Sequence, residues 1–258
     1  MSRAPEATEV DPTQRWEANA RKWIRWAREP GHDSYWRFHR DAFLPLLPPP
    51  PGRVLDVGCG EGRLSRDLKQ RGYDAVGVDA SATLIAAARE ADHDGTYLRG
   101  DAATLPFRNA EFDQVIAFMS LHDLLDLDAA VTEAVRVMKP AATLCIAIAH
   151  PLNSAGAFVS EDPAAEFVID DYMQTRSYED EVERDGLPMT FASVHRPLYA
   201  YFDALERNGL VVETLREAGE DDASVAAVPR RRRWQRVPLF MHLRARRGPR
   251  SAVPRRRL

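Results

Sequence analysis

A short apolar segment that runs directly into three closely spaced glycines is the feature that most constrains this 258-residue chain. The segment reads VLDVGCGEG at residues 54–62 and is followed by a helix-like stretch at 63–71. Glycines let the backbone turn tightly and let a ligand lie against main-chain N–H groups at the start of a helix. The pattern predicts a buried strand, a ligand-binding turn and a helix, which is the first unit of an α/β sheet.

Strand-like and helix-like segments alternate along the rest of the chain, as is typical of βαβ units. The expected strands are 75–78, 96–99, 112–118, 143–149, 210–215 and 237–245, and the expected helices are 82–91, 127–138 and 197–208. No helix is expected between the last two strands, so they should pair antiparallel. The predicted fold class is α/β: a doubly wound, Rossmann-like, seven-stranded and mostly parallel sheet with an antiparallel last strand, plus an N-terminal helical cap.

The cap is expected from two helical segments that precede the sheet. Trp16, Ala20, Trp23 and Ala27 recur at helical spacing after a helix start at Asp11-Pro12. A second amphipathic segment follows at 33–47, and the prolines at 48–51 end it. The stretch 151–196 lacks a clear period and is expected to be an irregular lid. The predicted divisions are a cap (1–52), an α/β core (53–150), a lid or acceptor-binding insertion (151–196), the C-terminal part of the sheet (197–248) and a disordered basic tail (249–258).

The composition excludes several classes of protein. Cys59 and Cys145 are the only cysteines, so neither a disulfide framework nor a Cys-x-x-Cys zinc site can form, and no metal is expected. No run approaches the roughly 18 to 20 apolar residues of a membrane helix, and the first residues lack a signal core. We therefore expect a cytoplasmic protein, monomeric or homodimeric, with no membrane partner. The formal net charge of −4 argues mildly against affinity for polyanions.

Three acidic residues at the ends of successive strands indicate which ligand the turn binds. The glycines give G-x-G-x-G and the next position is Arg63, which departs from the G-x-G-x-x-G pattern of dinucleotide sites. Asp56, just before the turn, would repel a diphosphate but suits a ligand with an ammonium and a sulfonium. Asp79 can accept hydrogen bonds from ribose hydroxyls, and Asp101 from an adenine amino group. The sequence therefore predicts a pocket for an adenosyl ligand without phosphates.

These motifs resemble those of the class I S-adenosylmethionine-dependent methyltransferases, of the methyltransferase type 11-like kind and most like actinobacterial small-molecule enzymes. The resemblance covers roughly residues 50–150 and includes the glycine turn, GDA at 100–102 and AVRVMKP at 134–140; PAA stands at 140–142 where the family usually has Pro-Gly-Gly. It implies S-adenosylmethionine as cofactor, bound by the 53–150 core. The implied cofactor contacts are Asp56, Gly58, Cys59, Gly60, Asp79, Ala80, Asp101, Ala102, Phe118 and Met119, with Tyr35 from the cap.

The resemblance also implies methyl transfer to oxygen or nitrogen of a small molecule, in natural-product or secondary metabolism. A general base is needed only for a poorly acidic hydroxyl or a protonated amine. His122 and His150 follow the fourth and fifth strands and are the candidate catalytic residues; His195 is a weaker candidate. Tyr35 and Trp36 could close over the sulfonium, although core packing is the favoured interpretation for them and for the Trp16/Trp23 stripe.

Alternatives remain open at this point. The arginines at 230–233 and 255–257 could contact phosphates and would suit a methyltransferase of RNA or protein, although a solvated run is the favoured interpretation. The end of the fourth strand reads FMSL at 118–121 and not the Asn/Asp-Pro-Pro-aromatic tetrad of base methyltransferases, which argues against a nucleic-acid partner. The remaining hypotheses are an NAD-type oxidoreductase and a non-catalytic module that binds an adenosyl ligand.

Overall fold

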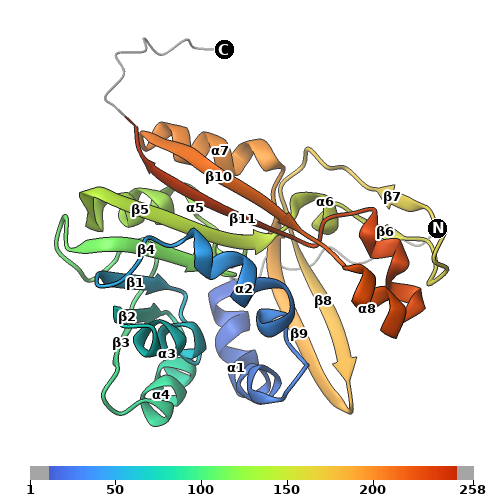
Figure 1. Cartoon of the computed structure of the whole chain (residues 1–258), viewed down its shortest axis with the longest axis horizontal. Coiled ribbons are helices and arrows are strands. Elements are labelled where there is room, and N and C mark those ends of the chain that lie inside the picture. The colour runs from blue at the N-terminus through green and yellow to red at the C-terminus, as the bar shows by residue number, and fades with distance from the viewer. Residues whose placement is uncertain (1–11, 249–258) are drawn as a thin grey trace.

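A seven-stranded sheet organises the computed structural model, which describes residues 12–248 (Figure 1). The strand order is β10-β11-β5-β4-β1-β2-β3. All strands run parallel except β11, which pairs antiparallel with both β5 and β10. The bounds are β1 Arg53–Val57, β2 Asp74–Asp79, β3 Thr96–Arg99, β4 Phe112–Phe118, β5 Met138–Ala149, β10 Leu210–Ala218 and β11 Phe240–Arg247. The predicted α/β class, with its seven mostly parallel strands and antiparallel last strand, is confirmed.

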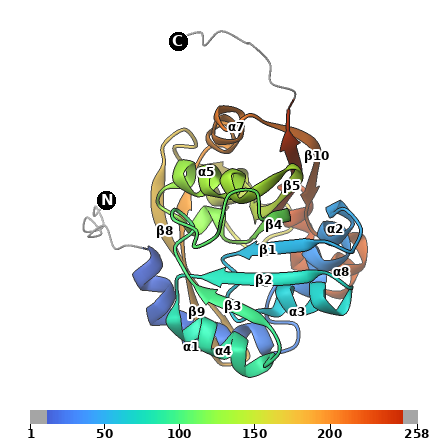
Figure 2. The same ribbon diagram turned by 90° about the vertical axis from the view of Figure 1, so that its left-hand side faces the viewer.

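Helices cover both faces of the sheet because successive strand residues point to opposite sides. In β1, Leu55 and Val57 pack under α5 and α7, whereas Val54 packs with α3 and the cap. Figure 2 shows the sheet between these layers. The helices are α3 Arg63–Gln70, α4 Ala82–Ala91, α5 Leu127–Val137 and α7 Leu198–Arg207. The alternation predicted from sequence is therefore the alternation that forms the core.

Two details of the sheet differ from the sequence-based expectation. Strand β5 begins at Met138, directly after α5, and not at 143, so the chain passes from helix to strand without a loop. Helix α8 (Asp222–Ala227) and a 3-10 helix, η4 (Pro229–Gln235), lie between β10 and β11, where no helix was expected. These short helices form the connection between the two strands, and β10 and β11 still pair antiparallel.

The N-terminal cap is helical, as the spacing predicts. Helix α1 (Pro12–Arg28) is followed by a π-helical segment η1 (Tyr35–His39), α2 (Arg40–Phe43) and a 3-10 turn η2 (Leu44–Leu46). The Glu17 carboxylate of α1 accepts hydrogen bonds from the hydroxyls of Ser81 (2.5 Å) and Thr83 (2.6 Å) at the start of α4. These contacts hold α1 at the edge of the sheet where the strands end. The expected N-cap Asp11 and the expected disordered tail 249–258 lie outside the described residues.

The 151–196 insertion is not irregular, which corrects the expectation. After α6 (Pro151–Ser154) it forms two hairpins, β6 Gly156–Phe158 with β7 Phe167–Ile169 and β8 Arg176–Arg184 with β9 Leu187–His195. Strand β8 is mostly exposed and charged, so it lacks the alternation of a half-buried strand from which it could have been recognised. Strand β9 lies beside α1 (Figure 1). The Trp16 indole of α1 donates to the carbonyl of Ala192 in β9 at 3.2 Å.

In residues 12–248, no helix is long and apolar enough to cross a membrane.

Candidate active site

The glycine turn after β1 is held by the neighbouring strand. The N–H groups of Gly58 and Cys59 donate to the carbonyl of Val78 at 2.8 and 3.0 Å. Gly58 and Gly60 have φ of +73° and +56°, the left-handed region that favours glycine. A Cβ on Gly58 would stand 2.4 Å from the Ser120 Cβ, so this turn has no room for a side chain. The backbone of the turn therefore stays bare toward a ligand.

Asp79, at the end of β2, ties that turn to the next helix. Its carboxylate accepts hydrogen bonds from the N–H of Gly60 (2.8 Å) and from the N–H of Ser81 (2.9 Å). Burial raises the pKa of Asp79, and these two backbone donors oppose the rise because they favour the charged form. Asp101 follows β3 and accepts from the N–H of Ala103 (2.9 Å). Two carboxylates with spare lone pairs thus stand at adjacent strand ends.

Asp56 is buried within β1 and is only half satisfied. The Ser65 hydroxyl of α3 donates to its Oδ2 at 2.7 Å, whereas its Oδ1 has no hydrogen-bond partner in the described chain. Burial raises the pKa of Asp56 to about 7. A buried carboxyl oxygen without a donor is costly unless a ligand supplies one.

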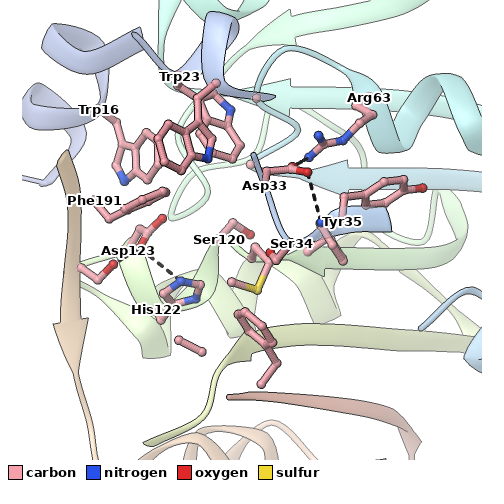
Figure 3. Close-up of a pocket in the computed structure, with 18 of the residues that line it drawn as sticks. Trp16, Trp23, Asp33, Ser34, Tyr35, Arg63, Ser120, His122, Asp123 and Phe191 are labelled. Atoms are coloured by element: carbon pink, nitrogen blue, oxygen red, sulfur yellow. Dashed lines mark hydrogen bonds and ion pairs between the residues drawn. The ribbon is translucent and has the colours of Figure 1, made fainter. Parts of the chain in front are cut away.

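One cavity of about 1010 Å³ collects these residues. Every residue predicted to contact the cofactor lines it, and so does His122. The opposite wall carries Trp16 and Trp23 from α1 and Phe191 from β9, whose rings meet edge to face at 5.7 to 6.5 Å (Figure 3). Ligand pockets typically measure about 300 to 1,000 Å³, so this cavity has room for a cofactor and a small second ligand.

The end of β4 supplies the floor of the cavity. Met119 has φ of +52°, a left-handed conformation that is uncommon for a residue with a side chain, and its N–H donates to Ala147 at 2.8 Å. The next residue, Ser120, donates its hydroxyl to the carbonyl of Val57 at 2.6 Å. Strands β4 and β1 are thereby joined at their tips, beside the glycine turn. Strained backbone of this kind is concentrated at functional sites.

His122 and Asp123 form a buried polar pair in the wall of the cavity. The His122 Nε2 lies 3.5 Å from the Asp123 Oδ1, and its Nδ1 has no partner in the described chain (Figure 3). The Ser193 hydroxyl donates to the same Asp123 oxygen at 2.6 Å. Burial lowers the pKa of His122 to about 3 and raises that of Asp123 to about 8. Both side chains are therefore mostly uncharged at neutral pH.

The other candidate histidines lie outside this cavity. The His150 Nδ1 accepts from the N–H of Leu152 (3.1 Å) as the N-cap of α6, and its Nε2 lies 3.0 Å from Glu217. The His195 ring nitrogens contact the Ser154 hydroxyl and the Tyr172 carbonyl at 2.7 and 2.9 Å. Neither histidine is among the residues that line the cavity. Of the three candidate histidines, His122 is therefore the one that the structure brings to the predicted cofactor residues.

The tryptophans show where the interpretation from sequence was wrong. Trp16 and Trp23 were expected in the core, but both are half-buried and form the cavity wall. Trp36 is 58% exposed and does not reach the cavity, and the Tyr35 hydroxyl donates to Asp67 at 2.6 Å. Sequence reasoning also missed Asp123, although it directly follows His122. It missed Phe191 and Ser193 as well, because their strand was not predicted.

The arginine run, expected to be a solvated loop, is also placed differently. Arg230, Arg231 and Arg233 in η4 line the mouth of the cavity, whereas Arg232 does not. Arg230 and Arg233 both form ion pairs with Glu161, at 3.3 and 3.7 Å. Arg231 and Arg233 are thus partly buried beside the cavity, whereas Arg230 and Arg232 are exposed, as a solvated run would be.

The sequence and the fold are similar to those of known proteins. The family model described as a methyltransferase domain matches residues 55–146. A demethylmenaquinone methyltransferase from Beutenbergia cavernae is 36% identical over 118 residues, which cover 45% of this chain and 48% of that protein. A malonyl-[acyl-carrier protein] O-methyltransferase from Enterobacter lignolyticus is 32% identical over 114 residues, covering 44% and 45%. An S-adenosylmethionine-dependent methyltransferase from Mesorhizobium loti matches with a TM-score of 0.68 and 25% identity over 83% of this chain and 98% of that one.

The chain carries a class I S-adenosylmethionine-dependent methyltransferase domain, matched over residues 55–146. It spans about half the length of the curated relatives that it matches. The residues present fit the cofactor that the family uses, S-adenosylmethionine. The turn at Gly58 has no room for a Cβ, and the Asp79 carboxylate lies at the end of β2. The Asp56 Oδ1 has no hydrogen-bond partner in the described residues, and an ammonium group could donate to it.

Proposed function

We propose that this class I methyltransferase transfers a methyl group from S-adenosylmethionine to an oxygen or nitrogen of a small molecule that lies in the same cavity. The observation that carries the proposal is the sharing of one cavity between the strand-tip carboxylates and an aromatic wall. That wall comes from two segments that are far apart in sequence, α1 and β9. An aromatic wall of this kind would enclose a small acceptor and restrict access by a macromolecule.

The cofactor side of the cavity would use bare backbone and three carboxyl groups. Bound S-adenosylmethionine supplies an electrophilic methyl group on a sulfonium. We assign Asp79 to the ribose hydroxyls, Asp101 to the adenine amino group and Asp56 to the ammonium. The side-chain-free backbone of Gly58 and Gly60 would lie against the methionine part.

The acceptor side would align and deprotonate the nucleophile. Displacement at a sulfonium needs mainly orientation and the exclusion of water, which an enclosing wall of Trp16, Trp23 and Phe191 favours. His122 is uncharged at neutral pH, so its free Nδ1 would accept the hydrogen bond of an acceptor hydroxyl or amine. Asp123, 3.5 Å from the same ring, would take a proton once it is ionised.

We place the acceptor among small secondary metabolites and do not carry forward the RNA or protein alternative. Two of the four arginines at 230–233, which partly suggested that alternative, are paired with Glu161. The relatives named above are methyltransferases of demethylmenaquinone and of malonyl-[acyl-carrier protein], so their names do not agree on one acceptor. The proposal therefore names the kind of acceptor and not its identity.

Two successive measurements test the proposal. Calorimetric titration with S-adenosylhomocysteine should give a one-to-one isotherm, and no binding at millimolar ligand would remove the cofactor assignment. Release of S-adenosylhomocysteine is then measured with a panel of phenols, amines and carboxylic acids as acceptors. Bulk tRNA is tested in the same assay as a macromolecular acceptor. Methylation of tRNA without turnover of any small molecule would overturn the acceptor assignment.

A further inference from the structure

Three arginines from separate segments lie close enough to act on one another electrostatically. Arg37 comes from η1 in the cap, Arg184 from the end of β8, and Arg231 from η4, and all three line the cavity. The Ser224 hydroxyl accepts hydrogen bonds from both Arg37 and Arg231, at 3.4 Å in the case of Arg231. Two guanidinium groups therefore share one hydroxyl oxygen, although their residues are far apart in sequence.

The protein neutralises only part of this charge. Within residues 12–248, Glu220 is the one carboxylate within 4.0 Å of any of the three guanidinium groups, and it pairs with Arg37. Arg184 donates to the carbonyl oxygen of His32, a neutral acceptor. The nearby Asp185 points instead to the His32 ring, with its Oδ2 3.6 Å from Nε2. One carboxylate thus forms an ion pair with one of these three positive charges, while Asp33, Asp185 and Asp221 act on them from further away.

The electrostatics of the arginines agree with this geometry. The pKa of Arg184 is lowered, first by burial and next by the positive charges of Arg231 and Arg37, ahead of the opposing effect of Asp33 and Asp185. Arg184 also lies over the Trp26 ring, with its guanidinium carbon 5.3 Å from the ring centroid, which fixes its position. Holding like charges together costs free energy that a bound anion would recover.

We propose that Arg37, Arg184 and Arg231 form an anion-binding subsite that selects methyl acceptors carrying a carboxylate or phosphate group. The subsite rests on the proposed function, because it lies in the cavity assigned to the acceptor. Guanidinium groups bind both of these anions through paired hydrogen bonds, and long-range attraction would also steer a charged acceptor to the cavity mouth. The ring or chain of the acceptor would then extend toward the aromatic wall.

The test uses probes that differ in charge and resemble one another in shape. The full chain is titrated calorimetrically with benzoate, phenyl phosphate and neutral benzamide, both without and with saturating S-adenosylhomocysteine. Arg184→Gln and Arg231→Gln remove charge from the subsite, and Arg184→Lys restores charge over Trp26. Arg232→Gln is the matched control, because Arg232 neighbours Arg231 in the same helix but is exposed and does not line the cavity.

We expect at least one anion to bind about tenfold more tightly than benzamide, which is about 1.4 kcal/mol. Arg184→Gln and Arg231→Gln should each remove most of that preference, Arg184→Lys should restore part of it, and Arg232→Gln should leave it unchanged. Comparison of benzoate with phenyl phosphate identifies the preferred anion. Equal binding of all three probes, or an equal loss in Arg232→Gln and Arg231→Gln, would overturn the subsite. Failure to bind S-adenosylhomocysteine would instead refute the proposed function, since anion preference is also measured without it.

Discussion

The main-chain N–H of Gly60 donates to the carboxylate of Asp79 across 2.8 Å and so joins the turn after β1 to the end of β2. The second oxygen of the same carboxylate accepts from the N–H of Ser81, the N-cap of α4. One side chain therefore sets the shape of the glycine turn and also faces the cavity. The cofactor assignment and the local fold depend on the same residue.

Replacing Asp79 tests this double role. Asp79→Ala should weaken S-adenosylhomocysteine binding by about 100-fold, because charge-assisted hydrogen bonds each contribute about 1.5–3 kcal/mol. Calorimetric titration measures the affinity, and circular dichroism shows whether the variant is folded. Asp94→Ala, at an exposed position after α4, is the control and should bind like the wild type. Unchanged affinity in folded Asp79→Ala would refute the ribose assignment.

Gly58→Ala tests the close approach of the turn to β4. Gly186 has nearly the same φ as Gly58, +75° against +73°, but a Cβ on it would meet nothing within 4 Å. Gly186→Ala should cost about 1 kcal/mol of unfolding free energy from backbone strain. Gly58→Ala should cost a further 1–3 kcal/mol, roughly, from its clash with Ser120, and should weaken the cofactor site. Denaturant unfolding of the two variants gives the difference, and equal costs would contradict the steric argument.

Asp123 should titrate far above an ordinary aspartate. Burial raises its pKa to about 8, and the hydrogen bond from Ser193 opposes that rise. Carboxyl ¹³C NMR should show a resonance with a midpoint near pH 8 that disappears in Asp123→Asn. Ser193→Ala should move that midpoint upward, because it removes a donor that favours the charged form. A midpoint near pH 4 in the folded wild type would show that the side chain is solvated and not held in the cavity wall.

A buried histidine pair should make the protein sensitive to mild acid. The His39 Nδ1 and the His242 Nε2 lie 2.8 Å apart, and burial lowers the pKa of both side chains, that of His242 to about 4. Because these folded-state pKa values lie below the unfolded value of 6.5, the stabilisation is complete above pH 6.5 and is lost as the pH falls toward 4. Between pH 7 and pH 5, wild type should lose about 2 kcal/mol more unfolding free energy than His242→Gln. Parallel losses in denaturant titrations of both proteins would contradict this.

Local pattern was sufficient for the sheet and for the cofactor half of the cavity. The residues 54–62 form a strand and a turn through their own backbone preferences, and Asp56, Asp79 and Asp101 stand at strand ends that meet at one edge of a parallel sheet. That convergence follows from the topology, so spacing alone predicted which side chains share the cavity. His122 was found in the same way, because it follows the end of β4.

The acceptor half depends on contacts between segments that no local pattern connects. Trp16 and Trp23 read as a core stripe, and only the position of β9 beside α1 shows that their rings face a cavity. Arg37, Arg184 and Arg231 are likewise unrelated in sequence and meet through tertiary packing. Periodicity reports which face of an element is apolar, but it does not report whether that face meets another element or borders a cavity. The proposed cofactor site could therefore be predicted from the sequence, whereas the proposed acceptor site depends on how the cap, the β8–β9 hairpin and η4 pack around the cavity.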